Sequence, residues 1–202
     1  DKTYQELNDM QDMFKDRNEV IEKSVKDHDL EVGYAVKQYL KNNKLDYKES
    51  DVNKIADIGG GIVRYYKNKF ERVRPYQLAE ALKMKFDHMP LDSDSMKSPA
   101  YPSGHSLQSR LIAEYYAEQY PEHRKGLIAG AEECGKGRIY AGWHYPSDHE
   151  AAVKLAKQIY PNITMRKTFK ESIIDIPRRT YAPKVFDDAD TKDPKIKASV
   201  KA

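Results

Sequence analysis

Residues 101–106 read Tyr-Pro-Ser-Gly-His-Ser. They precede the run 107–120, whose apolar residues recur at helical spacing, so Ser103 is expected to cap a helix. The free backbone N–H groups at a helix N-terminus attract anions, and Gly104 has no Cβ to keep an anion away. His105 adds a side chain that gains or loses a proton near neutral pH. The stretch therefore predicts a phosphate-binding helix start inside a helical fold.

A basic segment lies upstream, at residues 67–75, which read KNKFERVRP. Lys67 and Arg74 are separated by six residues in this segment. Pro75 disfavours helical geometry in the residue before it, so Arg74 is expected at a helix exit, with Lys67 about two turns back on the same face. Surface cations of this kind are common, but their position before the predicted phosphate site favours a binding role.

A third segment lies downstream, at residues 138–148, which read RIYAGWHYPSD. Pro146 suits the first position of a helix, which places His144 just before that helix and Asp148 in its first turn. Asp148 can then reach one ring nitrogen of His144 and leave the other unprotonated and nucleophilic. Arg138 adds another cation at the end of the preceding helix. The segment thus predicts an oriented histidine beside a cation.

Together, the three segments resemble the three-part signature of the acid phosphatase / vanadium haloperoxidase superfamily, also called the type 2 phosphatidic acid phosphatase superfamily. The amino-acid sequence around the motifs is most similar to that of the soluble bacterial class A non-specific acid phosphatases. The motif-bearing region, residues 67–148, covers about two-fifths of the chain. One residue departs from the pattern, because the family usually has Ser immediately before the third-motif arginine and this chain has Gly137.

The resemblance implies a metal-independent phosphomonoesterase that acts on small phosphate esters through a phosphohistidine. His144, oriented by Asp148, would attack phosphorus. His105 would protonate the leaving group and then activate water, and general-acid chemistry by a histidine of pKa about 6.5 predicts a mildly acidic optimum. The groups expected to bind the phosphate are Lys67, Arg74, Ser103, Gly104 and Arg138.

No cofactor and no metal are expected, and vanadate is expected to inhibit by binding at the phosphate site. Asp148 and His149 are adjacent and point apart on a helix, which argues against a shared metal. The pair at residues 28–29, His-Asp, lacks the companion residues of metal-dependent phosphohydrolases. His123 and His149 are interpreted as surface residues.

The rest of the chain predicts an all-α, single-domain bundle, because no sustained period-two alternation occurs. Residues 83–100 are rich in turn formers and are expected to form a loop near the site mouth. The domain is expected to span residues 1–176, with an extended or disordered tail at 177–202. The expected helices are two or three within 4–43 with a break near 27–29, then 51–69 with close packing or a kink at Gly59–Gly61, 103–120, 122–140 and 146–160.

Composition limits the partners and the compartment. The 202 residues carry a net charge of +3 with charges of both signs interleaved, so no nucleic-acid arm is expected. No apolar run approaches the roughly 20 residues of a membrane span. A small phosphate ester is the expected partner, and a homo-oligomer stays open because the tail could clamp a neighbouring subunit. The chain begins at Asp1, so it is expected in the periplasm or outside the cell if a signal peptide has been removed, and in the cytoplasm otherwise.

Two alternatives stay open at this point. The first is vanadate-dependent haloperoxidase activity on the same scaffold, although the short chain argues against it. The second is a degenerate, non-catalytic binding protein, which the loss of the family hydroxyl at Gly137 keeps in view. The physiological substrate also stays open among nucleotides, sugar phosphates and pyrophosphates.

Overall fold

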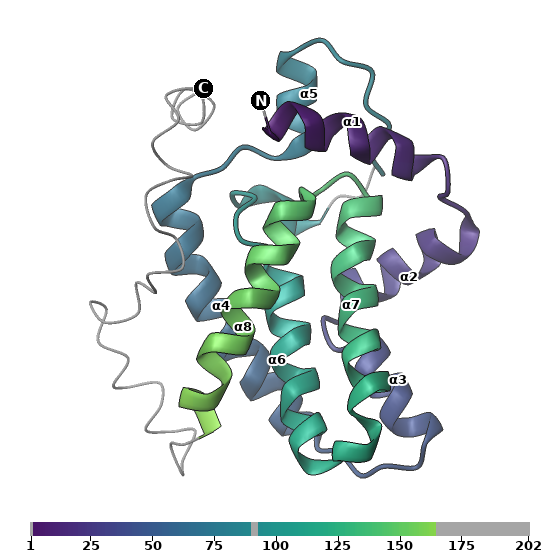
Figure 1. Ribbon diagram of the computed structural model, residues 1–202, viewed down its shortest axis with the longest axis vertical. Helices are drawn as coiled ribbons and strands as arrows, with labels where there is room; N and C mark the ends of the chain where they lie inside the picture. Colours follow the sequence, from purple (N-terminus) through teal and green to yellow (C-terminus); the bar gives the residue numbers. More distant parts are fainter. Residues whose placement is uncertain (1, 90–92, 165–202) are drawn as a thin grey trace.

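The computed structural model describes residues 2–89 and 93–164, and every regular element in those ranges is a helix. The all-α prediction is confirmed (Figure 1). The predicted boundary at residue 176 and the predicted tail lie outside the described residues. The elements are α1 (Lys2–Phe14), α2 (Glu19–Leu30), α3 (Tyr34–Asn42), α4 (Glu49–Phe70), α5 (Pro75–Ala81), the short 3-10 helices η1 (Asp94–Lys97) and η2 (Pro121–His123), α6 (Gly104–Gln119), α7 (Arg124–Tyr140) and α8 (Pro146–Thr164).

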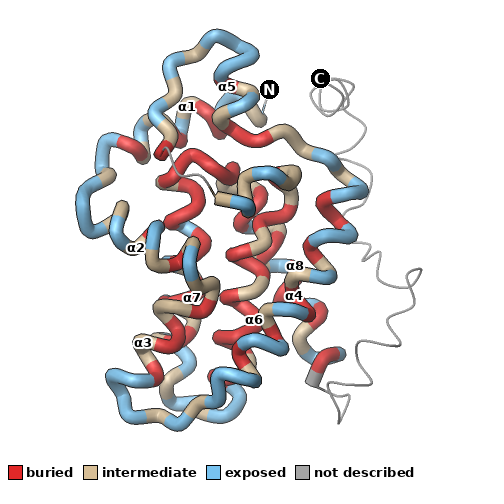
Figure 2. Tube along the Cα trace, turned by 180° about the vertical axis from the view of Figure 1, so that it is seen from behind, coloured by how far each residue is buried: buried red, intermediate tan, exposed pale blue. Residues whose placement is uncertain are grey.

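Helix α6 is the centre of the bundle and packs against α4, α7 and α8 (Figure 1). Its apolar side chains Leu107, Leu111 and Ile112 are fully buried, and buried residues line the neighbouring helices where they face it (Figure 2). Helix α4 approaches closely at Gly59, where a Cβ would lie 2.9 Å from Gln108 Cγ. The predicted role of this glycine in close helix packing is therefore confirmed.

The N-terminal region forms three helices, but the predicted break near residues 27–29 is wrong. Asn18 caps α2 by accepting hydrogen bonds from the backbone N–H groups of Val20 and Ile21. His28 lies inside α2, where its Nδ1 donates to the carbonyl oxygen of Ser24, 2.7 Å away. The polar residues at 27–29 are thus accommodated within a helix, and the breaks fall before Glu19 and after Leu30.

The segment after α4 also differs from the prediction. Helix α4 ends at Phe70, and Glu71 adopts a left-handed conformation with φ of 48°. Pro75 begins the short helix α5, where its missing N–H is not needed, and Arg74 is the N-cap. Arg74 therefore stands before a helix rather than at a helix exit.

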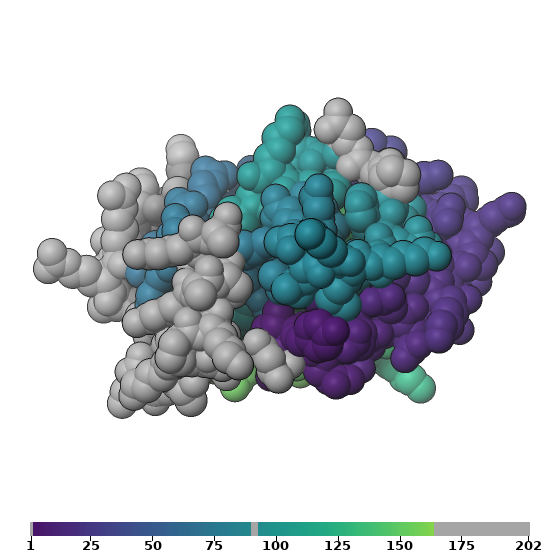
Figure 3. All heavy atoms as spheres, turned by 90° about the horizontal axis from the view of Figure 1, so that it is seen from above, coloured from purple at the N-terminus to yellow at the C-terminus, as the bar shows by residue number. Residues whose placement is uncertain are grey.

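The functional motifs gather at one end of the bundle. The C-terminal ends of α4 and α7 and the N-terminal ends of α6 and α8 lie there, in the upper half of Figure 1. Seen from that end, α1 and the segment that contains α5 lie over the bundle (Figure 3). Among the described helices, none has the length and apolar character that crossing a bilayer requires.

Candidate active site

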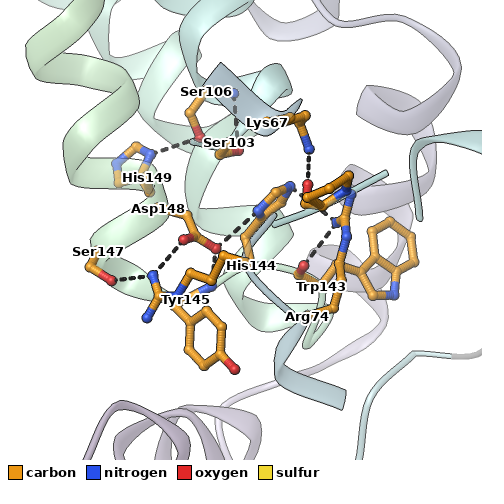
Figure 4. A network of polar contacts seen from close by, with 12 residues as sticks. Lys67, Arg74, Ser103, Ser106, Trp143, His144, Tyr145, Ser147, Asp148 and His149 are labelled. Carbon is orange, nitrogen blue, oxygen red and sulfur yellow. Dashed lines mark hydrogen bonds and ion pairs between the residues drawn. The ribbon is translucent and has the colours of Figure 1, made fainter. Parts of the chain in front are cut away.

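His144 is held from two sides by buried partners. Its Nδ1 lies 3.2 Å from Asp148 Oδ2, and its Nε2 lies 3.2 Å from Arg74 Nη1 (Figure 4). Since a carboxylate accepts and a guanidinium donates, the ring carries its proton on Nδ1 and directs a lone pair from Nε2 toward Arg74. The sequence predicted this orientation of His144 by Asp148, and the geometry agrees with it.

Asp148 is fixed by contacts that the sequence analysis did not foresee. Its Oδ1 accepts a 2.6 Å hydrogen bond from Arg72 Nη1, and its Oδ2 accepts one from the Tyr145 backbone N–H at 2.9 Å. Arg72 in turn pairs with Glu6 of α1 at 3.0 Å and lies over the Tyr145 ring. The position of Arg72, two residues before Arg74 in the basic segment, is the one sequence feature that could have pointed to a role at the site. Nothing in the residue spacing connects Arg72 with Glu6.

The three predicted cations converge on the segment 93–100. Lys67 donates to Ser98 Oγ at 3.1 Å and to the Pro99 carbonyl. The Arg74 Nε donates to the carbonyl of Ser98 at 2.9 Å. Arg138 donates to Ser95 Oγ at 2.6 Å. The segment predicted as a loop near the site therefore contacts all three cations, and its oxygens occupy donors that the sequence analysis assigned to a phosphate.

Burial and mutual repulsion lower the pKa values of two of these cations. The pKa of Lys67 is lowered to about 7, chiefly by burial and secondly by the nearby Arg74. Burial also lowers the pKa of Arg74 to about 10, with Arg138 as the second cause. Like charges brought together away from water favour binding of an anion, because the anion offsets both effects.

His105 lies in the first turn of α6, and its Nε2 has no hydrogen-bond partner among the described residues. Burial, then Arg138 and His144, hold its pKa well below the usual value. This direction opposes the protonation of His105 that the sequence predicts for a general acid at mildly acidic pH. A bound anion would act in the opposite direction and raise the pKa of His105.

Ser103 and Gly104 form the predicted helix start. Ser103 caps α6 by accepting from the Ser106 backbone N–H, and its own N–H donates to the Asp148 carbonyl at 3.1 Å. This second bond joins the start of α6 to the start of α8. A Cβ at Gly104 would lie 3.5 Å from Val63 Cγ1, an ordinary contact, so packing alone does not require glycine there.

Two polar residues were misjudged. His149 was predicted at the surface, but it is 8% exposed and bonds to Ser106 and Glu132. The prediction failed because Glu132 and Ser106 lie far away in sequence and meet only through the packing of α6, α7 and α8. Asp29 was set aside together with the metal hypothesis, yet it pairs with Arg138 at 2.7 Å and lies 3.9 Å from His105 Nε2. No group of three metal-ligating side chains that could hold an ion occurs in the described residues.

Comparison with known proteins adds a family to this geometry. Residues 55–156 match the model of the PAP2 superfamily. A non-specific acid phosphatase of Providencia stuartii is 26% identical over 161 residues, which cover 75% of this chain and 63% of that protein. Non-specific acid phosphatases of Salmonella typhimurium and Salmonella typhi are each 27% identical over 114 residues, which cover 54% of this chain and 43% of those proteins.

The chain therefore spans less than two thirds of the length of these curated relatives. The matched region begins within α4 and ends within α8, so it contains every residue that the sequence analysis assigned to the site. With half of its residues matched by the family model, the chain belongs to the PAP2 superfamily.

Proposed function

We propose that this protein is a metal-independent phosphomonoesterase that works through a phosphohistidine on His144. The observation that carries the proposal is the meeting of two buried histidines and three buried cations at one end of the bundle, with Arg74 bonded to the nucleophilic nitrogen of His144. The buried Nε of Arg138 and Nε2 of His105 have no hydrogen-bond partner in the described chain. Buried polar atoms of this kind are rare in proteins and fit a site that an anionic ligand completes.

The first chemical step transfers the phosphoryl group to the enzyme. Lys67, Arg74 and Arg138 neutralise the nonbridging oxygens, with Ser103 and the N–H of Gly104 completing the set. Nε2 of His144 forms the N–P bond while the ester P–O bond breaks. The negative charge of the bound substrate raises the pKa of His105, so that the ring is protonated in the complex. The departing oxygen takes this proton from His105.

The second step returns the enzyme to its starting state. A water molecule attacks phosphorus and gives its proton to His105, the N–P bond breaks, and inorganic phosphate leaves. Asp148 stabilises the imidazolium that forms on His144, as buried carboxylates do in other histidine dyads.

The experiment is hydrolysis of p-nitrophenyl phosphate by the purified chain, with and without EDTA and vanadate. Activity that resists EDTA and is inhibited by vanadate is expected. His144→Ala should abolish both turnover and the acid-labile phosphoenzyme, and His105→Ala should reduce turnover by about 10²- to 10⁴-fold. Loss of activity on chelation, or full activity in His144→Ala, would contradict the mechanism.

The same preparation distinguishes the alternatives. Halide oxidation in the presence of vanadate and peroxide would assign the site to peroxidase chemistry. Phosphate binding without turnover of any ester would identify a binding protein.

A further inference from the structure

A buried chain of hydrogen bonds leads away from Ser103 to Ser106, His149 and Glu132, and these three residues have no part in the mechanism above. Ser106 Oγ lies 2.9 Å from Ser103 Oγ and 3.0 Å from His149 Nδ1. On the far side of the ring, His149 Nε2 lies 3.0 Å from Glu132 Oε2. Figure 4 shows the chain from Ser103 through Ser106 to His149.

Packing around this chain leaves room for the ring and little else. Ser103 is 0% exposed and Ser106 1% exposed, so neither hydroxyl has water as an easy alternative partner. A Cβ on Gly135 would overlap His149 Nδ1 and would lie 2.9 Å from Ser106 Oγ. Glycine at this position of α7 is therefore what admits the imidazole next to Ser106.

Charged groups on α6 and α7 lie around Glu132, which is the partner of the His149 ring. Glu132 on α7 bonds directly to Nε2, and this bond is the main cause of the lowered pKa of the Glu132 carboxyl. Arg110 on α6 lies 3.3 Å from Glu132, and Lys136 on α7 also lowers the pKa of that carboxyl. Glu132 is thus ionised beside His149, with Arg110 as its second bonded partner.

The state of the ring decides which way two hydroxyl protons point. A neutral ring with its proton directed at Glu132 accepts at Nδ1 from the Ser106 hydroxyl, whose oxygen then accepts from the Ser103 hydroxyl. Ser103 in that state offers only lone pairs to an anion. A protonated ring donates to Ser106, which donates to Ser103, and the Ser103 hydroxyl is left free to donate to a phosphate oxygen.

We propose that His149 is a positioning residue that acts through Ser106 to set the direction of the Ser103 hydroxyl, so that the site binds phosphate more tightly when the His149 ring is protonated. The inference rests on the proposed function in one respect, since it takes Ser103 as a contact of the phosphate. It adds a pH-sensitive element that lies outside the three motifs of the family signature.

The test measures binding of inorganic phosphate by calorimetry at several pH values between about 5 and 8, the range in which imidazoles titrate. His149→Leu should weaken binding by about tenfold at the acidic end, the size of effect expected for losing a hydrogen bond to a charged ligand. The ratio of wild-type to variant affinity should shrink as the pH rises. His123→Gln, which alters a partly exposed histidine at the other end of α7, is the matched control and should leave the affinity unchanged.

A double-mutant cycle separates positioning from a general structural effect. In a Ser103→Ala background, His149→Leu should have no further effect on phosphate binding, because the hydroxyl through which His149 acts is gone. An equal loss in both backgrounds, or a ratio that does not change with pH, would overturn the proposal.

A second variant covers the case in which His149→Leu does not fold. Glu132→Gln keeps the shape of the side chain but removes the charge that favours the protonated ring, and it should also weaken phosphate binding at acidic pH. Unchanged affinity in a folded Glu132→Gln protein would count against the relay. Wild-type protein that binds phosphate but hydrolyses no ester would refute the proposed function alone, whereas failure to bind phosphate would refute both.

Discussion

The proposed mechanism depends on how the His144 ring is held. Asp148 keeps the Nδ1 proton of His144 in place while Arg74 faces Nε2. Asp148→Asn keeps the shape of the side chain but removes the charge that stabilises the imidazolium and pairs with Arg72. We expect kcat to fall by roughly 10⁴-fold, as in other histidine–carboxylate pairs. Steady-state kinetics measure this, and a fall of less than tenfold would show that Asp148 is not needed to orient the ring.

Gly137 leads to a prediction about stability at the same scale. A Cβ at this position would lie 3.4 Å from Val25 Cγ2, an ordinary contact, so Gly137→Ala fits the helix without displacing α2. Alanine in a helix interior is more favourable than glycine by about 0.5–1 kcal/mol. Chemical denaturation should show this gain in the free energy of unfolding. Gly137→Ser should fit equally well, and comparing its kcat/KM with that of Gly137→Ala tests whether the family hydroxyl contributes to turnover.

At the scale of elements, α1 supports the site through Glu6. Its carboxylate accepts from the Ser147 backbone N–H at 2.7 Å and from the Ser147 hydroxyl at 2.9 Å, and it pairs with Arg72. A carboxylate from a distant helix thus caps the N-terminus of α8, where the helix dipole favours negative charge.

Removal of this cap should affect stability and turnover together. Glu6→Ala removes the acceptor of the half-buried Ser147 N–H and should lower the free energy of unfolding by about 0.5–2 kcal/mol, as the loss of a helix cap does. It should also lower kcat, because Arg72 then holds Asp148 less firmly. Asp9→Ala changes an exposed acid on the same helix and is the control. A destabilised Glu6→Ala protein with wild-type kcat would limit α1 to a structural role.

The same elements show what could be predicted from the sequence. The starts of α6 and α8 were correct because Ser103 and Pro146 are local signals that act within one turn. Helix α5 was missed because a proline is compatible with both the end of one helix and the first turn of the next. The contacts of Glu6 and His149 could not be predicted, since each joins residues from separate helices and depends on how those helices pack.

At the scale of the whole molecule, the site's charge couples folding to pH. The pKa values of His105 and His144 lie well below their usual value in the folded protein, chiefly through burial. The unfolded chain therefore binds protons at a higher pH than the folded one, and the free energy of unfolding should fall as the pH drops below about 6.5. Lys67 acts in the same direction at higher pH, because its pKa of about 7 lies below that of an unfolded lysine.

Phosphate should oppose this effect. An anion in the site favours the protonated forms of the same three groups, so it should raise the melting temperature more at pH 6 than at pH 9. Thermal melts with phosphate and with an equal ionic strength of sodium chloride measure the difference. An equal shift at both pH values would show that these groups do not face the bound anion.

The Asp29 carboxylate on Arg138 has a consequence for the end of the catalytic cycle. In the proposed mechanism, an arriving phosphate competes with the Asp29 carboxylate for Arg138, and this carboxylate takes the place of the product as it leaves. Release of inorganic phosphate should therefore be fast, and the affinity of the site for phosphate should be lower than it would be without Asp29. Asp29→Asn should lower the inhibition constant for phosphate by about tenfold, which corresponds to about 1.4 kcal/mol of binding free energy. An inhibition constant that stays the same or rises would mean that Asp29 does not compete with the product. A lower constant would mean that the Asp29 carboxylate speeds the dissociation of inorganic phosphate from the site.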